Sequence, residues 1–279
     1  LYALWANSAC VNAIIDAGIS EVIYAIDDPN PLVRRASART VLSSAGISVR
    51  SGLCEAEARK LNEVYFTAMI QKRPFVSLKA AISINGKIST GVGEQAYLSS
   101  KASLTEVHRL RREVSAILTG VNTVQIDNPQ LSVRHYPLGA GYKHPDVVVL
   151  DSNLNTPPDA ALFSVDRRVF ICHSVSLDTS DHPLAGIADL IYIPQRSYGL
   201  DWDILLNKLF ERKILTLMIE AGQAVMTSAL ECLDIDKAYF FIVPILCSDD
   251  APGVFSDQSL TALESIQKFS SRRHSFFDK

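Results

Sequence analysis

The sequence predicts an α/β protein with two domains, the second of which contains a largely parallel sheet. Its 279 residues are many for one small domain and suit two. Strand-like segments alternate with helix-like segments along most of the chain, which is typical of parallel sheets covered by helices. Several apolar segments have few polar interruptions, as expected for strands that are buried on both faces.

The first domain is predicted to cover residues 1–73 as a three-layer α/β unit. Helices are expected at 11–17, 35–44 and 55–69, and strands at 21–26 and 47–49. The last helix must end before Lys72-Arg73-Pro74, because proline disfavours a helical conformation in the residue before it. We therefore place the domain boundary at this proline.

The second domain is predicted to cover residues 74–279. Its first strand, 75–84, is apolar except for Ser77, Lys79 and Ser83. Further strands are expected at 115–119, 147–150, 168–172, 190–193, 215–219 and 238–243. Helices are expected between them, at 104–112, 202–211 and 224–233.

Composition and charge exclude several classes of partner. A net charge of −3 and a pI near 6.1 provide no basic surface for nucleic acid. The longest apolar runs are too short to cross a bilayer, so no membrane partner is predicted. The chain does not start with a secretory leader, which favours a cytoplasmic location, or an organellar one if a missing N-terminus carried a transit peptide.

Cysteine and histidine usage predicts reduced thiols and no metal site. The five cysteines are scattered, whereas a disulfide framework is usually denser and occurs in smaller chains. The cysteines and the six histidines lack the spacings that hold zinc. We expect His108, on a helix beside several arginines, to lie at the surface.

Three junctions that follow predicted strands indicate a ligand site, because ligands of parallel sheets bind beyond the carboxyl ends of the strands. They are Gly120-Val121-Asn122-Thr123, Asp151-Ser152 and Glu220-Ala221-Gly222-Gln223. One such junction usually serves packing alone. Three in one sheet favour a dinucleotide or a phosphate ligand.

Two arginines and one lysine are candidates for substrate contacts. Arg111 and Arg134 flank the first junction, and a guanidinium is well suited to phosphate. The alternative is a solvated helix face, which the neighbours Arg109 and Arg112 support. Lys79, within a buried strand, must reach the surface, pair with an anion or point into a cleft.

The same segments resemble the bifunctional deaminase/reductase family of riboflavin biosynthesis. The resemblance is carried by 73–87 (RPFVSLKAAISINGK), 108–111 (HRLR), 116–124 (AILTGVNTV), 127–134 (DNPQLSVR), 149–152 (VLDS) and 219–222 (IEAG). These blocks keep the order and spacing of the family. The resemblance covers nearly the whole chain.

By this resemblance, the second domain has the dihydrofolate-reductase-like fold and binds NADPH. The implied cofactor-binding residues are Ala81, Tyr97, Thr123, Asp127, Ser152, Gly222 and Gln223. The implied catalytic and substrate-binding residues are Lys79, Gln95, Arg111, Leu131, Arg134 and Glu220. The implied reaction is hydride transfer to C1′ of 5-amino-6-(5-phosphoribosylamino)uracil, a phosphoribosylamino-pyrimidine, giving the ribitylamino product, and the family implies a homodimer through the reductase domain.

The first domain resembles the C-terminal part of the family's cytidine-deaminase-like domain. Zinc chemistry in that domain needs a histidine, two cysteines and a glutamate, of which Cys10 alone is present. A lone cysteine cannot hold catalytic zinc, so no zinc and no deamination are expected. The chain is then either a piece of a bifunctional enzyme or a natural reductase whose deaminase half has decayed.

Some positions depart from the family pattern. Asn85 replaces a usual aspartate, Gln95 a usual serine and Tyr97 a usual tryptophan, and the tail after Phe255 matches poorly. Two alternatives therefore stay open. One is a reductase of another pterin or pyrimidine, and the other is a non-catalytic remnant that binds a ligand.

Overall fold

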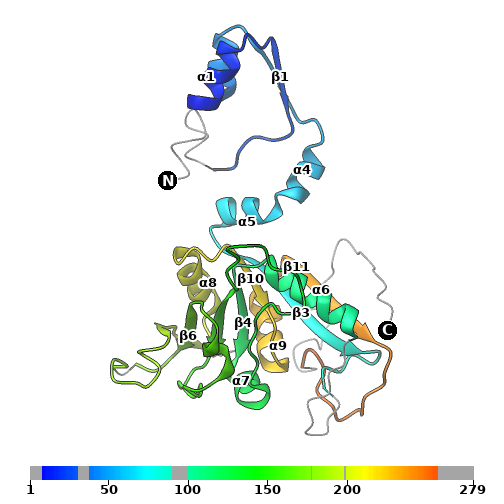
Figure 1. Ribbon diagram of the computed structural model, residues 1–279, viewed down its shortest axis with the longest axis vertical. Coiled ribbons are helices and arrows are strands. Elements are labelled where there is room, and N and C mark those ends of the chain that lie inside the picture. Colours follow the sequence, from blue (N-terminus) through cyan, green and yellow to red (C-terminus); the bar gives the residue numbers. More distant parts are fainter. Residues whose placement is uncertain (1–7, 31–37, 90–99, 177, 198, 257–279) are drawn as a thin grey trace. The chain divides into compact units, whose positions relative to one another are not determined.

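The chain divides into two compact units, Leu1–Arg73 and Pro74–Lys279. The computed structural model describes residues 8–30, 38–89, 100–176, 178–197 and 199–256 (Figure 1). No helix within these ranges is long and apolar enough to span a membrane.

The first unit has a small parallel sheet with helices. Its elements are α1 (Ser8–Asp16), β1 (Glu21–Tyr24), α3 (Ala38–Ser44), β2 (Ser48–Ser51), α4 (Glu55–Leu61) and α5 (Glu63–Gln71). Strands β1 and β2 pair in parallel. Helices α1 and α3 pack with β2 around Val11, Leu42 and Ile47.

The single helix predicted over 55–69 is two helices in the structure, with the break at Asn62. This residue has φ −110°, and its side-chain amide donates to the carbonyl of Ala58 at 2.9 Å. Asparagine interrupts helices in this way because its side chain competes for backbone hydrogen bonds.

The second unit is built on a seven-stranded sheet in the order β11-β3-β10-β4-β5-β6-β7, with every neighbouring pair parallel. The strands are β3 (Phe75–Ser83), β4 (Ala116–Gly120), β5 (Asp146–Leu150), β6 (Val169–His173), β7 (Asp189–Tyr192), β10 (Thr216–Ile219) and β11 (Lys237–Val243). All seven were predicted, to within about two residues at each end. The five inner strands are largely buried, which explains why their sequences are so apolar, whereas the edge strands β7 and β11 are partly exposed.

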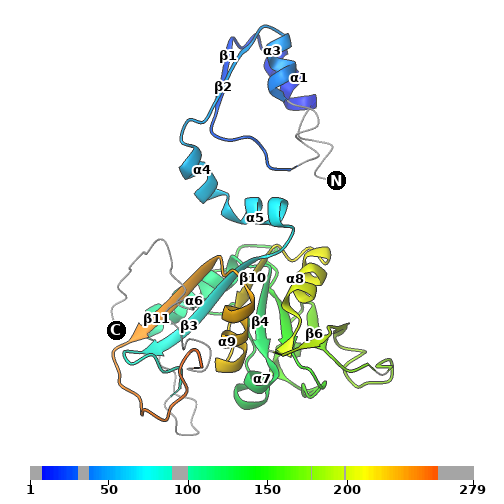
Figure 2. The same ribbon diagram turned by 180° about the vertical axis from the view of Figure 1, so that it is seen from behind.

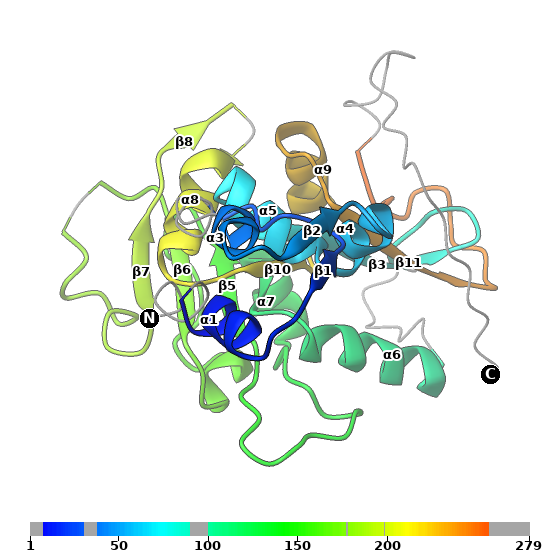
Figure 3. The same ribbon diagram turned by 90° about the horizontal axis from the view of Figure 1, so that it is seen from above.

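Helices cover both faces of this sheet. Helices α6 (Lys101–Arg112) and α7 (Val121–Asp127) lie on one side, and α8 (Trp202–Glu211) and α9 (Gln223–Cys232) on the other (Figures 2 and 3). Alternate side chains of each strand enter one of two cores. In β4, Leu118 joins the core under α8 and α9, whereas Ile117 joins the core under α6 and α7.

Helices α6, α8 and α9 confirm the predicted helices, but α7 was not predicted. Its seven residues directly follow the glycine that ends β4. The sequence reasoning also missed a short 3₁₀ helix, η2 (Ala161–Ser164), and a small antiparallel hairpin of β8 (Gln195–Arg196) and β9 (Gly199–Leu200). These elements are too short for their periodicity to be recognised.

The central position of Leu118 gives a test of the sheet core. Leu118 is 0% exposed, so Leu118→Ala should lower the free energy of unfolding by about 2–5 kcal/mol, through lost burial and the cavity left behind. Denaturant unfolding followed by Trp202 fluorescence measures this, because Trp202 lies in the same core. The matched control is Ile126→Ala at an 81% exposed position of α7, for which we expect less than about 0.5 kcal/mol. Equal effects of the two changes would contradict the packing described.

Candidate active site

The candidate site lies at the carboxyl end of β10, between the middle of β3 and the last residues of β4. Ile219 of β10 is aligned with Leu78 of β3 and with Leu118 of β4. The next residue along β3 is Lys79, and the residue after Ile219 is Glu220. Parallel register therefore brings together two ionisable side chains that are 141 positions apart in the chain.

Glu220 is the centre of a buried ion-pair network. Its two carboxylate oxygens accept hydrogen bonds from Nε and Nη2 of Arg111 at 2.8 and 2.9 Å, and Oε2 lies 3.5 Å from Nζ of Lys79. The side chains of Lys79, Glu220 and Arg111 are only 15%, 9% and 12% exposed. Arg111 reaches the carboxylate from α6, so the network joins this helix to β3 and β10.

The electrostatic balance keeps Glu220 ionised. Burial alone would raise the pKa of its carboxyl, but Arg111 and Lys79 outweigh this effect and lower the pKa to about 2. In the same way Glu220 outweighs the effect of burial on Arg111 and raises the pKa of its guanidinium. At neutral pH Glu220 can therefore accept hydrogen bonds but cannot supply a proton.

Two of the predicted glycine junctions lie against each other. A Cβ added to Gly120 would come within 2.9 Å of Val225 in α9, so the end of β4 can approach this helix only because residue 120 is glycine. At Gly222, the residue before α9, a Cβ would lie 3.9 Å from the hydroxyl of Thr123. No side chain caps the start of α9. The junction therefore presents backbone N–H groups beside a hydroxyl.

The third junction carries a buried carboxylate. Asp151 is 0% exposed, and its Oδ2 accepts from the backbone N–H and the hydroxyl of Thr156, each at 2.7 Å. Its Oδ1 and the Thr119 hydroxyl are buried without a hydrogen-bond partner. The carbonyl of the adjacent Ser152 accepts from the backbone N–H of Ser174. A buried polar atom without a protein partner is uncommon, and a ligand, an ion or a water molecule can supply the missing hydrogen bond.

Arg134 and Leu131, both predicted substrate contacts, differ in their surroundings. The Arg134 side chain is exposed, and its Nη1 lies 3.3 Å from Oε1 of Gln130. Leu131 is 3% exposed and packs in the core under α6 and α7, so a ligand could reach it through its backbone. The guanidinium of Arg111 is directed at Glu220 rather than left free for an anion.

His108 does not lie at the surface as we expected. It is 3% exposed, and its Nδ1 accepts from the backbone N–H of Arg134 at 2.9 Å. The neighbouring arginines do face the solvent, Arg112 exposed and Arg109 half-buried, but they also contact carboxylates or aromatic rings. Arg109 pairs with Glu106 and Glu113, and Arg112 lies over the rings of Tyr136 and Tyr142. No sequence signal separates these two arrangements.

The structure describes some of the remaining predicted site residues and not others. Ala81 is half-buried in β3 and aligned with Phe241 of β11. Asp127 ends α7, and partial burial raises the pKa of its carboxyl. The Gln223 side chain donates to the carbonyl of Phe255 at 3.1 Å. Gln95 and Tyr97 lie outside the described residues.

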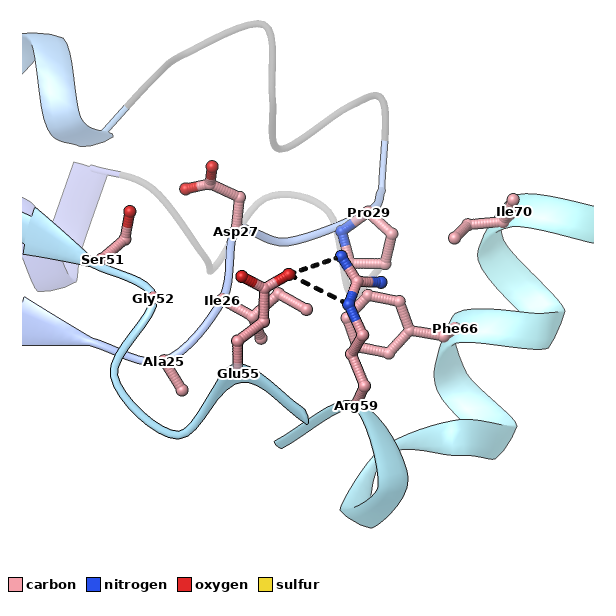
Figure 4. A pocket seen from close by; sticks show the side chains of 10 residues that line it. All are labelled: Ala25, Ile26, Asp27, Pro29, Ser51, Gly52, Glu55, Arg59, Phe66 and Ile70. Atoms are coloured by element: carbon pink, nitrogen blue, oxygen red, sulfur yellow. Dashed lines mark hydrogen bonds and ion pairs between the residues drawn. The ribbon is translucent and has the colours of Figure 1, made fainter. Parts of the chain in front are cut away.

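The first unit has a cavity of its own, of about 160 Å³ (Figure 4). Its polar lining includes Asp27 and the ion pair of Glu55 with Arg59, whose Nη2 and Oε1 are 2.9 Å apart. Cys10 is exposed on α1. Among the residues that the structure describes, no three histidine, cysteine or acidic side chains gather where they could hold a metal ion.

Comparisons with known proteins agree on one family. The model of the RibD C-terminal domain matches residues 74–275. The riboflavin biosynthesis protein RibD of Aquifex aeolicus is 38% identical over 237 residues, which cover 84% of this chain and 64% of that protein. The RibD protein of Bacillus amyloliquefaciens is 31% identical over 268 residues, covering 92% and 69%. The chain thus spans less than two thirds of the Aquifex relative.

Solved structures show the same likeness. The diaminohydroxyphosphoribosylaminopyrimidine deaminase/5-amino-6-(5-phosphoribosylamino)uracil reductase of Thermotoga maritima superposes with a TM-score of 0.80 at 27% identity, covering 96% of this chain and 72% of that one. The riboflavin biosynthesis reductase of Saccharomyces cerevisiae, at 20% identity and a TM-score of 0.53, shares the fold. The predicted α/β class with a dihydrofolate-reductase-like domain is confirmed. This chain belongs to the RibD C-terminal domain family.

Proposed function

We propose that the chain catalyses the NADPH-dependent reduction of 5-amino-6-(5-phosphoribosylamino)uracil to its ribitylamino product, as a step of riboflavin biosynthesis. The observation that carries this proposal is the buried network of Lys79, Glu220 and Arg111 at the strand ends, within the domain that the RibD family model matches. The Thermotoga maritima relative is named for the same reductase activity.

The three junctions suit a nicotinamide dinucleotide. Free N–H groups at the start of α9, the hydroxyl of Thr123 and the absence of a side chain at Gly222 suit a pyrophosphate. Ser152 and Gln223 would hold further polar groups of the cofactor, with Ala81 and Asp127 beside it. When bound, the cofactor supplies the hydride. The protein positions the substrate and excludes water.

The charged residues suit a phosphorylated sugar substrate. Arg134 has an exposed guanidinium and would bind the phosphate. Glu220, held as a carboxylate, would accept hydrogen bonds from the substrate, and Lys79 would donate them. Arg111 would hold Glu220 in place. Hydride addition at C1′ would break the bond between C1′ and the ring oxygen, and this oxygen would take a proton from water to become the hydroxyl of the open chain.

The direct test mixes the full chain with NADPH and the deaminated substrate and follows the loss of NADPH absorbance. Turnover that forms the ribitylamino product supports the proposal. NADPH binding without turnover would instead indicate a non-catalytic remnant. Turnover of an unphosphorylated pterin or pyrimidine at a higher kcat/KM would indicate the other kind of reductase.

The phosphate assignment predicts a selective effect at Arg134. Arg134→Ala should raise the substrate KM roughly a hundredfold, since a charge-assisted contact to phosphate contributes about 1.5–3 kcal/mol. The Kd of NADPH should stay nearly unchanged. Steady-state kinetics and a fluorescence titration of NADPH measure the two quantities. Arg212→Ala, at an ion pair with Asp189, is the control, and equal loss of substrate and NADPH binding in Arg134→Ala would refute the assignment.

The network predicts an acid-sensitive contribution to stability from Glu220. Glu220→Gln keeps the shape but removes the charge between two buried cations, so the free energy of unfolding should fall by about 3 kcal/mol at pH 7. Because the folded pKa is lowered, this difference should be complete above the unfolded value of 4.5 and shrink as pH falls toward about 2. Denaturant unfolding at several pH values measures it. Glu113→Gln at the exposed pair with Arg109 should change stability by less than about 1 kcal/mol.

We further propose that the first unit does not deaminate. Among the family's zinc-binding residues Cys10 alone is present, and one thiolate cannot hold catalytic zinc. Adding zinc should therefore leave the melting temperature unchanged, and the aminopyrimidine substrate should release no ammonia. Calorimetry and an ammonia assay test this, with EDTA-treated protein as the control. Stoichiometric zinc bound through Cys10 would overturn the proposal.

A further inference from the structure

Between α7 and β5 the chain contains a segment without regular secondary structure, residues 130–134, whose three central residues are buried. Leu131, Ser132 and Val133 are 3%, 1% and 2% exposed, and Leu131 has a φ of 50°. A buried backbone outside helices and sheets must find other hydrogen-bond partners. Those partners determine which conformation the segment adopts.

Two arginines hold the carbonyl groups of the segment. The guanidinium of Arg167 donates to the carbonyls of Gln130 and Leu131, the latter at 2.7 Å. Arg111 donates to the carbonyl of Ser132 at 3.1 Å through Nη1, while its other nitrogens bind Glu220. The segment is thus connected to the ion-pair network by one side chain.

Two histidines hold the amides that follow. The N–H of Val133 donates to Nδ1 of His144 at 3.3 Å, and the N–H of Arg134 donates to Nδ1 of His108 at 2.9 Å. A neutral imidazole can accept at this nitrogen, but an imidazolium cannot. Five consecutive residues therefore each have a backbone group bound by a basic side chain, and the segment ends at the exposed side chain of Arg134.

We propose that His108, His144 and Arg167 are positioning residues, which hold the 130–134 segment so that Arg134 is placed for the substrate phosphate. This inference rests on the proposed function. If the backbone of this segment is already ordered in the free protein, substrate binding does not have to order it. The conformational entropy lost on binding is then smaller, and the affinity is higher. The left-handed conformation of Leu131 is unfavourable for a residue with a side chain, and the surrounding contacts can impose it.

The charges around His108 favour its neutral, accepting form. Burial is the largest cause and lowers its pKa to about 4; nearby Arg111, His135 and Arg134 lower it too, and Glu220 opposes them. The ring of His135 packs edge-on against it at 4.8 Å. At neutral pH, His108 is therefore an acceptor for the Arg134 amide.

His144 is also favoured in its neutral form by its surroundings. Burial, and then the charge of Arg167, lower its pKa, and the ring of Tyr142 lies edge-on to it at 5.7 Å. Because the pKa of His108 in the folded protein is lowered to about 4, its ring stays neutral and its contact intact until the pH approaches that value, and the contact is lost around pH 4. Substrate binding through Arg134 should weaken over the same range.

The test compares His108→Ala with His108→Asn in the full chain. Loss of the acceptor in His108→Ala should raise the substrate KM about tenfold, with little change in kcat or in the Kd of NADPH. Asparagine offers an oxygen near the position of Nδ1, so His108→Asn should restore most of the affinity. Between pH 6 and pH 4 (about two units, reaching the folded pKa of His108), KM should rise more in the wild type than in His108→Asn.

Amide hydrogen exchange tests the positioning without turnover. The Arg134 amide should be protected in the wild type and in His108→Asn, and should lose protection in His108→Ala. If His108→Ala fails to fold, the test compares the amide exchange and the pH dependence of KM in His108→Asn with those of the wild type. His182→Ala is the matched control, because Nδ1 of His182 also accepts a backbone N–H, from Leu184 at 3.3 Å, but outside the segment. Its KM should equal that of the wild type.

Binding of ribose 5-phosphate, measured by calorimetry, separates failure of this inference from failure of the proposed function. Wild-type binding that is unchanged in His108→Ala would overturn the positioning role and leave the reductase proposal intact. A freely exchanging Arg134 amide in the wild type would also overturn it. A wild type that neither binds ribose 5-phosphate nor reduces the substrate would overturn the proposed function, and with it the role of the segment in binding.

Discussion

The buried carboxylate of Glu220 is the constraint on which the geometry of the site depends. A charge this deeply buried is stable only with partners, and an unpaired one would cost several kcal/mol. Lys79 and Arg111 supply the partners from β3 and α6, so the register of β3 against β10 and the position of α6 are coupled. A shift of either element would leave a charge unpaired.

The network carries more positive than negative charge, and this excess extends along the α6 side of the sheet. Two cations share one carboxylate, and Arg111 continues to the carbonyl of Ser132. From there the 130–134 segment leads to Arg134. Such a surface suits an anionic ligand, while the small residues and free N–H groups around Gly222 suit a second one. A phosphorylated substrate and a dinucleotide together match this arrangement.

The two units differ in the size of their hydrophobic cores. In the second unit, two extensive cores lie on opposite faces of a seven-stranded sheet. In the described part of the first unit, three buried residues pack between α1, α3 and a two-stranded sheet. Two strands alone bury little apolar surface, so the second unit is the part in which the core best supports precise positioning of side chains.

The fold class, the strands of the main sheet and the positions of the three junctions could be predicted from local sequence patterns, because apolar runs, glycines and prolines act locally. Family resemblance added the candidate residues, including Lys79 and Glu220, although no local pattern says that these two meet. The three-dimensional arrangement was needed to show that Arg111 faces Glu220, and that His108 is buried and bound to the Arg134 amide rather than exposed. Hydrogen bonds between side chains and a distant irregular backbone leave no periodic signal, since they depend on how α6 packs over a segment that follows it by about 20 residues.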